Sequence, residues 1–92
     1  MSGLRDNTAQ GRFELDVEGG TAFITYWLRG DVVIMLHAEV PLELRGQGVG
    51  AKLVREALEL VRSRNQTVNP RCSFVATYIH RHPEYQSLLA KQ

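Results

Sequence analysis

The stretch Arg45-Gly46-Gln47-Gly48-Val49-Gly50 lies between two segments of different periodicity, and this junction decides how the chain folds. Before it, residues 32–40 are almost continuously apolar, which is typical of a central strand covered on both faces. After it, apolar residues recur at helical spacing, at Val49, Leu53, Val54, Ala57, Leu58 and Val61. The junction is therefore a turn from a buried strand into an amphipathic helix.

Two further strands are expected on the N-terminal side of this turn. Residues 13–17 alternate between apolar and acidic side chains, and residues 21–29 are aromatic and β-branched. Gly-Gly at 19–20 and Gly-Asp at 30–31 supply tight turns, so the three strands form an antiparallel meander. Residues 1–11 are polar and contain glycine, so we expect them to form a flexible N-terminus.

The residues that follow the helix complete the expected fold. Asn65 ends the helix, and residues 67–69 form a short strand that the long crossover places parallel to the third strand. Ser73 caps a second helix, and Pro83 ends that helix and starts a last helical turn. The predicted class is α+β (mixed α/β): an antiparallel meander, a helix, a fourth strand parallel to the third, and C-terminal helices.

Length and composition limit the class of protein. The chain has 92 residues and a net charge of +1, so residues 12–92 are expected to form one domain. That charge gives no argument for a nucleic acid or a membrane as partner. The single cysteine, Cys72, excludes an internal disulfide and a cysteine-based zinc site, and no metal is expected. No secretory signal is visible, so we expect a cytoplasmic protein. A monomer is the default expectation.

The glycine turn suits a phosphate or pyrophosphate, because glycines let backbone N–H groups approach a ligand at a helix start. The alternative interpretation is that these glycines serve only the tight packing of the turn and bind no ligand. A P-loop is excluded, because Ala51-Lys52 follows the last glycine and supplies no hydroxyl for magnesium. Gly46, Gly48 and Ala51 have the spacing of a dinucleotide-binding fingerprint. This motif is rejected because no acidic residue ends the next strand and the chain is too short for a full doubly wound sheet.

Three blocks of sequence resemble one superfamily. Arg45-x-x-Gly48-x-Gly50 is similar to the Gln/Arg-x-x-Gly-x-Gly/Ala signature of the GNAT superfamily of N-acetyltransferases. Three longer blocks resemble its small, single-domain YjdJ-type branch: His37-x-x-Val40-Pro41-x-x-x-Arg45-Gly46-Gln47-Gly48, Asn69-Pro70-x-Cys72-Ser73-Phe74-Val75 and Arg81-His82-Pro83-Glu84-Tyr85. The similarity runs from about the third strand to near the C-terminus.

The resemblance implies transfer of an acetyl group from acetyl-coenzyme A, as cosubstrate, to an unidentified amine on a small molecule or a protein. It implies that backbone amides of the turn bind the coenzyme A pyrophosphate. The residues concerned are Arg45, Gly46, Gln47, Gly48, Val49 and Gly50. It also implies that Cys72 and His37 are the catalytic residues.

The residues themselves leave the chemistry open. Cys72 precedes an expected helix, as reactive thiols do, but a lone cysteine among apolar residues is more often part of a core. His37 is expected to share a strand face with Met35 and Glu39, whose carboxylate can orient the imidazole. Two mechanisms remain open. Either the amine attacks the thioester directly, or Cys72 accepts the acetyl group first and passes it on to the amine. A role for Cys72 is the hypothesis we favour at this stage.

Other residues are candidates for supporting roles. The Val40 amide is expected to polarise the thioester carbonyl, because the strand opens before Pro41. Tyr78 is either an acid for the departing thiolate or a core residue, and residues 80–82 either meet the 3′-phosphate of the coenzyme or end a helix. A non-catalytic acyl-coenzyme A binding or sensing module and a protein-interaction domain are the alternatives to an enzyme.

Overall fold

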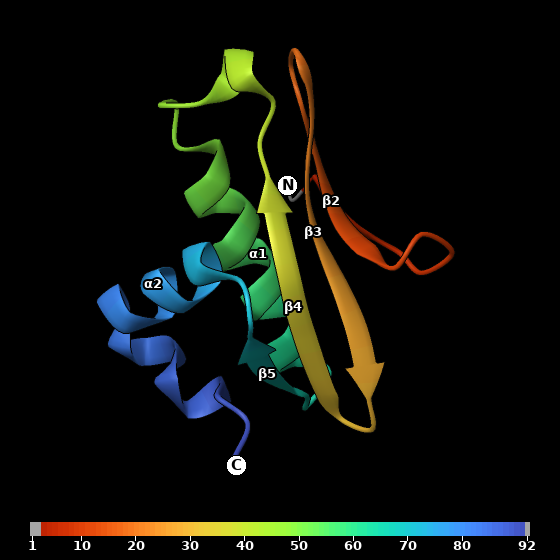
Figure 1. Cartoon of the computed structure of the whole chain (residues 1–92), viewed down its shortest axis with the longest axis vertical. Coiled ribbons are helices and arrows are strands. Elements are labelled where there is room, and N and C mark those ends of the chain that lie inside the picture. Colours follow the sequence, from red (N-terminus) through yellow and green to blue (C-terminus); the bar gives the residue numbers. More distant parts are fainter. Residues whose placement is uncertain (1–2, 92) are drawn as a thin grey trace.

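One mixed sheet with helices packed on it forms the structure, a computed structural model that describes residues 3–91. The strand order is β1-β2-β3-β4-β5; neighbours are antiparallel up to β4, and β4 pairs with β5 in parallel (Figure 1). The strands are β1 (Leu4–Asn7), β2 (Arg12–Val17), β3 (Gly20–Arg29), β4 (Val32–Glu39) and β5 (Thr67–Pro70). The helices are η1 (Leu42–Leu44), α1 (Val49–Ser63), α2 (Ser73–Arg81) and η2 (Pro83–Leu88).

The predicted α+β class is confirmed: the meander is β2-β3-β4, and the strand after the helix is parallel to β4. The turn at 30–31 is also confirmed, because Arg29 pairs with Val32. The first turn is one residue earlier than expected, at 18–19, since Val17 pairs with Gly20. A tight turn there needs a left-handed residue, and Gly19 has a φ of 100°.

The N-terminus corrects an expectation, because residues 4–7 of the segment predicted to be flexible form strand β1. β1 pairs with β2 along its whole length, and Leu4 packs against the core. Asp6 fixes this strand from its other side: it accepts hydrogen bonds from the Tyr26 hydroxyl at 2.5 Å and from Arg64 Nη1 at 2.7 Å. Polarity misled the prediction, because these polar groups find partners in the fold. Residues 1–2 lie outside the described part.

The helices begin and end where local geometry requires. Gly48 is the N-cap of α1 with a φ of 78°, and Asn65 follows the C-cap with a φ of 57°, so the predicted end at Asn65 is confirmed. The expected cap of α2 at Ser73 is one residue late. Cys72 is the N-cap, since its backbone is extended and its carbonyl accepts the first helical hydrogen bond, from Ala76. Within residues 3–91, no helix is long and apolar enough to cross a membrane.

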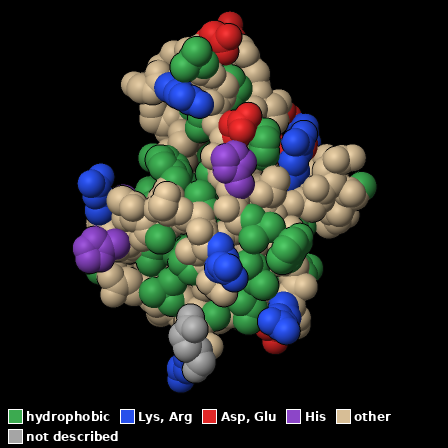
Figure 2. Space-filling view, in the orientation of Figure 1, with side chains coloured by type: hydrophobic (Ala, Val, Ile, Leu, Met, Phe, Trp, Pro, Cys, Tyr) green, Lys and Arg blue, Asp and Glu red, His purple; other side chains and the backbone are tan. Residues whose placement is uncertain are grey.

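The main cluster of buried apolar side chains lies on one face of the sheet, against α1 and α2, which lie on that side. They include Phe13, Leu15, Ile24, Met35, Leu53, Leu58, Val61, Val75 and Ile79. Figure 2 shows the opposite face, where hydrophobic side chains over the lower halves of β3 and β4 face the viewer without a covering helix. The expectation that residues 32–40 are covered on both faces is therefore wrong: this strand has strand neighbours at both edges but helices on one face only.

A bulge in β4 changes which residues share a face. Tyr26 pairs with Met35, but Thr25 pairs with His37, so Leu36 is an extra residue in β4. Met35 is fully buried in the core, and after the bulge Ala38 takes the inward direction. His37 and Glu39 consequently lie on the uncovered face. The expectation that His37 shares a face with Met35 is wrong, because strict alternation does not hold across a bulge.

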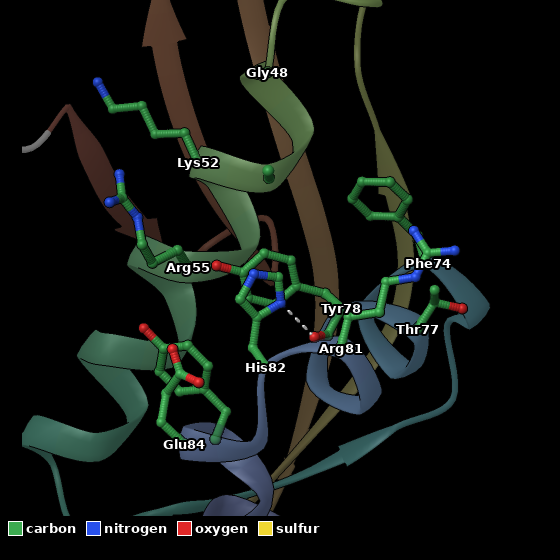
Figure 3. A pocket seen from close by; sticks show the side chains of 11 residues that line it. Gly48, Lys52, Arg55, Phe74, Thr77, Tyr78, Arg81, His82 and Glu84 are labelled. Atoms are coloured by element: carbon green, nitrogen blue, oxygen red, sulfur yellow. Dashed lines mark hydrogen bonds between the residues drawn. The ribbon is translucent and has the colours of Figure 1, made fainter.

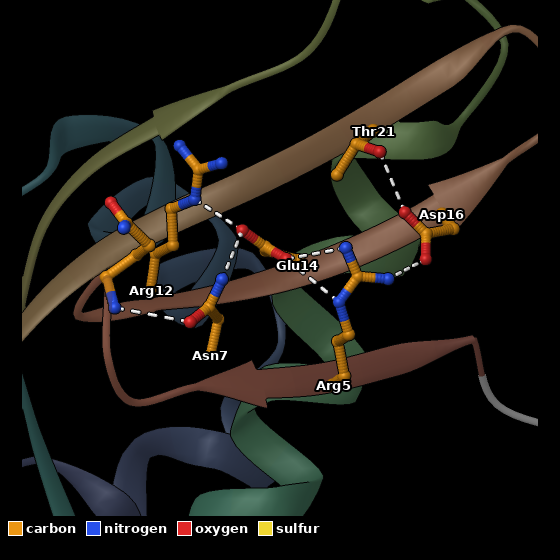
Figure 4. A network of polar contacts seen from close by, with 7 residues as sticks. Arg5, Asn7, Arg12, Glu14, Asp16 and Thr21 are labelled. Atoms are coloured by element: carbon orange, nitrogen blue, oxygen red, sulfur yellow. Dashed lines mark hydrogen bonds and ion pairs between the residues drawn. The ribbon is translucent and has the colours of Figure 1, made fainter.

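Glu14 of β2 is the one buried charged residue among those described, and it lies on the uncovered side of the sheet. Its carboxylate accepts hydrogen bonds from Arg5 Nε at 2.9 Å, Arg12 Nε at 2.5 Å and Asn7 Nδ2 at 3.1 Å (Figure 4). Arg5 also pairs with Asp16 on the same strand as Glu14. This network joins β1 to β2 by side chains as well as by the backbone.

Acid is expected to weaken the fold through Glu14. The hydrogen bond from Arg12 holds the pKa of Glu14 below its ordinary value of 4.5, although burial opposes this. The ionised form therefore stabilises the fold above that ordinary value, and the contribution is lost as the pH falls through the lowered one. Glu14→Gln should cost about 1–2 kcal/mol of unfolding free energy at neutral pH. Urea unfolding at neutral and acidic pH measures this; an equal loss of stability on acidification in wild type and variant would contradict it.

Candidate functional site

A groove opens where β4 and β5 part. Their parallel pairing ends at Met35 and Pro70, and the last contact is the Cys72 N–H donating to the Met35 carbonyl at 3.0 Å. β4 continues beyond this point without β5, and a hollow of about 420 Å³ lies beside it. We call it the strand-end groove. It is lined by residues 37–40, 44–46 and 48–51 and by Phe74 of α2.

The glycine turn forms one wall of this groove. Gly46 and Gly48 have φ angles of 82° and 78°, which glycine adopts without strain. A Cβ built on either residue meets no heavy atom within 4 Å, so their backbone borders open space. Gly50 differs: a Cβ there would lie 2.8 Å from Cζ of Phe74. Gly46 and Gly48 are thus required by backbone geometry, whereas a side chain at Gly50 would displace the Phe74 ring.

Open backbone donors are the main chemical feature of the turn. The amide N–H groups of residues 46–51 donate no hydrogen bond of standard geometry to any residue in the described part of the chain. Lys52 is the first to do so, to the carbonyl of Gly48 at 3.1 Å. These donors lie at the positive end of a 15-residue helix dipole. The arrangement is suited to an anion such as a diphosphate.

The polar side chains of the turn hold its shape. Arg45 Nε donates to the Val40 carbonyl at 3.2 Å, and Gln47 Nε2 donates to the Glu43 carbonyl at 3.1 Å. The Val40 side chain packs against the core, and its amide donates no hydrogen bond to another described residue. The structure therefore brings every predicted cofactor-binding residue to one place, and all of them except Gln47 line the groove.

A second hollow, of about 620 Å³, lies between α1 and the segment from α2 to η2, and we call it the helix-side hollow (Figure 3). It shares Gly48, Ala51 and Phe74 with the strand-end groove, so the two are continuous past the Phe74 ring. Its remaining lining residues are Lys52, Arg55, Thr77, Tyr78, Arg81, His82, Glu84 and Tyr85. Three cationic side chains from two helices thus border a cavity that begins at the glycine turn.

The sequence pointed to only some of these residues. Of the basic cluster at residues 80–82, Arg81 and His82 line the helix-side hollow and His80 does not. Lys52 and Arg55 were not identified from the sequence as candidates. Their spacing of three residues on α1, just after the glycine turn, nevertheless indicates that they share one face of the helix. Phe74 gave no sequence signal for its position between the two cavities, because a helical phenylalanine is ordinarily part of a core.

Tyr78 lies in the wall of the helix-side hollow and does not line the strand-end groove. Its ring stacks on that of His82 at 3.9 Å, and His82 Nδ1 donates to the Tyr78 carbonyl at 2.8 Å (Figure 3). Burial raises the pKa of Tyr78, while the charge of Arg55 opposes this. The phenol therefore stays protonated near neutral pH, and Tyr78 is partly a core residue with its edge in the hollow.

The two predicted catalytic residues lie on opposite faces of the sheet. His37 is on the uncovered face with its side chain 60% exposed, and His37 Nε2 is 3.0 Å from Glu39 Oε1. Cys72 belongs to the core on the helix side and is 9% exposed. No hydrogen bond joins the two side chains within residues 3–91, and Cys72 lines neither the groove nor the helix-side hollow.

Two comparisons with known proteins agree with this geometry. Residues 12–88 match the family model described as GCN5-related N-acetyl-transferase. The chain is also similar to a solution NMR structure from Staphylococcus aureus, provisionally assigned as a GCN5-like N-acetyltransferase. That match has 30% sequence identity and a TM-score of 0.70, and it covers 100% of this chain and 93% of the other.

Proposed function

The chain belongs to the GCN5-related N-acetyltransferase family, and from that premise we propose that it transfers the acetyl group of acetyl-coenzyme A to a primary amine. Family membership supports acyl transfer in general. One observation of this chain supports the donor: a run of unpaired backbone amides, with glycines at positive φ, lies at the start of α1 beside an open groove. Such a cluster of donors is complementary to the diphosphate of coenzyme A.

The two cavities fit the remaining parts of the donor. The strand-end groove offers the free edge of β4 to an extended pantetheine arm, which carries amide groups of its own. The helix-side hollow offers Lys52, Arg55 and Arg81 to the 3′-phosphate. With the diphosphate at the glycine turn, the thioester would lie near Val40. The open amide of Val40 can then donate to the thioester carbonyl and polarise it.

His37 is the base for the acceptor amine, and Glu39 positions it. With Nε2 donating to the Glu39 carboxylate, the lone pair of the imidazole is on Nδ1. In the proposed reaction the amine nitrogen bonds to the acetyl carbon, the carbon–sulfur bond breaks, and the amine proton passes to Nδ1 of His37. The coenzyme leaves as a thiolate, which takes a proton from solvent. Glu39 positions the ring and stabilises its charged form.

Acetyl-coenzyme A is expected to raise the melting temperature of the protein. At about 100 times its dissociation constant a ligand adds about 2.7 kcal/mol, which corresponds to about 10 °C or more in a domain of this size. ATP, which lacks the pantetheine arm, is the matched control. No shift with either compound would contradict the proposal, and a shift without acetylation of any amine would identify a binding or sensing module.

Cys72 is expected to be dispensable for transfer. Its thiol is buried on the helix side and is not paired with His37, so the geometry favours direct attack by the amine over the cysteine route. Turnover of Cys72→Ala should stay within about threefold of wild type. Intact mass after mixing with acetyl-coenzyme A should show no acetyl adduct. An adduct on the wild type, together with loss of turnover in the variant, would establish Cys72 as the acetyl carrier instead.

A further inference from the structure

The uncovered face of the sheet carries apolar side chains that the core does not use. On β3 and β4 these are Phe23, Trp27, Ile34 and Leu36, and none of them packs against the core cluster. Trp27 is 66% exposed and pairs across the strands with Ile34. Arg12 lies over the ring of Phe23, 4.4 Å from its centroid. We call Trp27, Ile34 and Leu36 the apolar strip (Figure 2 shows this face). Trp27 is exposed, and Ile34 and Leu36 are partly exposed. An apolar surface of this kind marks a contact site.

The shape of the strip favours a macromolecular occupant. Neither the strand-end groove nor the helix-side hollow includes any of its three residues. Small molecules bind in concave sites that enclose most of their surface, which a sheet face does not do. Protein interfaces are flatter, and tryptophan is among the residues that contribute most to their affinity. A protein segment is therefore the occupant that this surface suits.

The strip continues directly into the proposed catalytic residues. Along β4, Ile34 and Leu36 lead to His37 and Glu39, and both of the latter line the strand-end groove. Ile34 and His37 pair with Trp27 and Thr25, which are two residues apart on β3, so the two β4 residues lie about 7 Å apart, which two residues of an extended chain span. The Glu39 carboxylate is 54% exposed on the same face and is complementary to an ammonium group. One extended segment can therefore contact the strip and bring an amine to His37.

We propose that the acetyl acceptor is a lysine of a protein segment that lies on the apolar strip. An apolar side chain two residues from that lysine, on the same face of the extended segment, packs on Trp27 and Ile34. The lysine stem passes over the end of β4 and brings the amine to Nδ1 of His37. This inference rests on the proposed acetyl transfer to amines and adds the class of acceptor.

Matched peptides test the inference. Two N-terminally capped peptides, each with a single lysine, differ only in carrying leucine or serine two residues before it. The wild type should acetylate the leucine peptide about tenfold better in kcat/KM. Trp27→Ala should lose this preference, and its turnover of ethylamine should not change. Leu28→Ala is the control, since Leu28 is 57% exposed but pairs with the core residue Val33 on the other face; it should keep the preference.

The other outcomes separate this inference from the proposed function. If the wild type and Trp27→Ala show the same preference for the leucine peptide, the inference is wrong. Turnover of ethylamine with neither peptide acetylated would also overturn it, while acetyl transfer to amines would stand. If the protein acetylates no amine at all, both this inference and the proposed function are wrong. Sedimentation distinguishes one further case: a wild-type dimer that Trp27→Ala converts to a monomer would assign the strip to a second copy of this chain.

Discussion

Gly48→Ala is expected to weaken acetyl-coenzyme A binding about a hundredfold while the protein stays folded. The new methyl group would enter the open space beside the turn, where no protein atom lies within 4 Å. It would hold the diphosphate away from the amides of residues 46–51. Loss of two charge-assisted hydrogen bonds, at about 1.5 kcal/mol each, accounts for the effect. Isothermal titration with coenzyme A measures it.

The chain contains a matched control for this substitution. Gly30, in the turn between β3 and β4, also has a positive φ, of 60°, and also has nothing within 4 Å of a built Cβ. Alanine in the left-handed region costs about 1–2 kcal/mol at either position, so the two variants should be destabilised alike. Only Gly48→Ala should lose coenzyme A affinity. Equal affinities in the two variants would show that the turn does not bind the diphosphate.

His37→Ala is expected to lower kcat about a hundredfold at neutral pH, with little change in coenzyme A affinity. Without a base, the reaction depends on amine that is already deprotonated. A lysine amine has an ordinary pKa of about 10.4, so that fraction grows about tenfold for each pH unit below this value. The activity of the variant should therefore rise steadily between about pH 7 and 9, while that of the wild type rises less steeply.

Glu39→Gln separates positioning from proton transfer. An amide still forms a hydrogen bond with Nε2 of His37 but does not stabilise the charged ring. We expect a decrease in kcat of about tenfold, smaller than for His37→Ala, with KM for the amine less affected. If His37→Ala instead keeps wild-type kcat at neutral pH, water or the acceptor itself supplies the base, and His37 has no part in proton transfer.

The sequence predicted the donor site better than the chemistry around it. A phosphate-binding turn is a local feature: glycines at fixed spacing, a buried strand before them and an amphipathic helix after them are all visible in residues 32–61. Gly46 and Gly48 accordingly occupy the expected positions, and the structure adds that both have a positive φ. The parallel strand followed from crossover length alone, and it is β5 that leaves the edge of β4 free beyond Met35.

Features that depend on tertiary pairing were not predictable in this way. β1 is polar, and only its pairing with β2 and the bonds of Asp6 to Tyr26 and Arg64 show why it is ordered. The bulge at Leu36 has no local signature, yet it decides that His37 lies apart from the core and from Cys72. Continuous hydrophobicity in β4 suggested two covered faces. Its outward residues Ile34 and Leu36 are instead partly exposed and belong to the apolar strip.

In the proposed function, the open amides at the start of α1 bind the diphosphate of coenzyme A. The most direct test is an amide NMR titration of the wild-type protein with coenzyme A. We expect the N–H resonances of Gly46, Gly48 and Gly50 and of their neighbours through Ala51 to shift the most, and the resonances of the amides in the turn at Gly30 to stay unchanged. Saturable binding that leaves the resonances of residues 46–51 unchanged would contradict it.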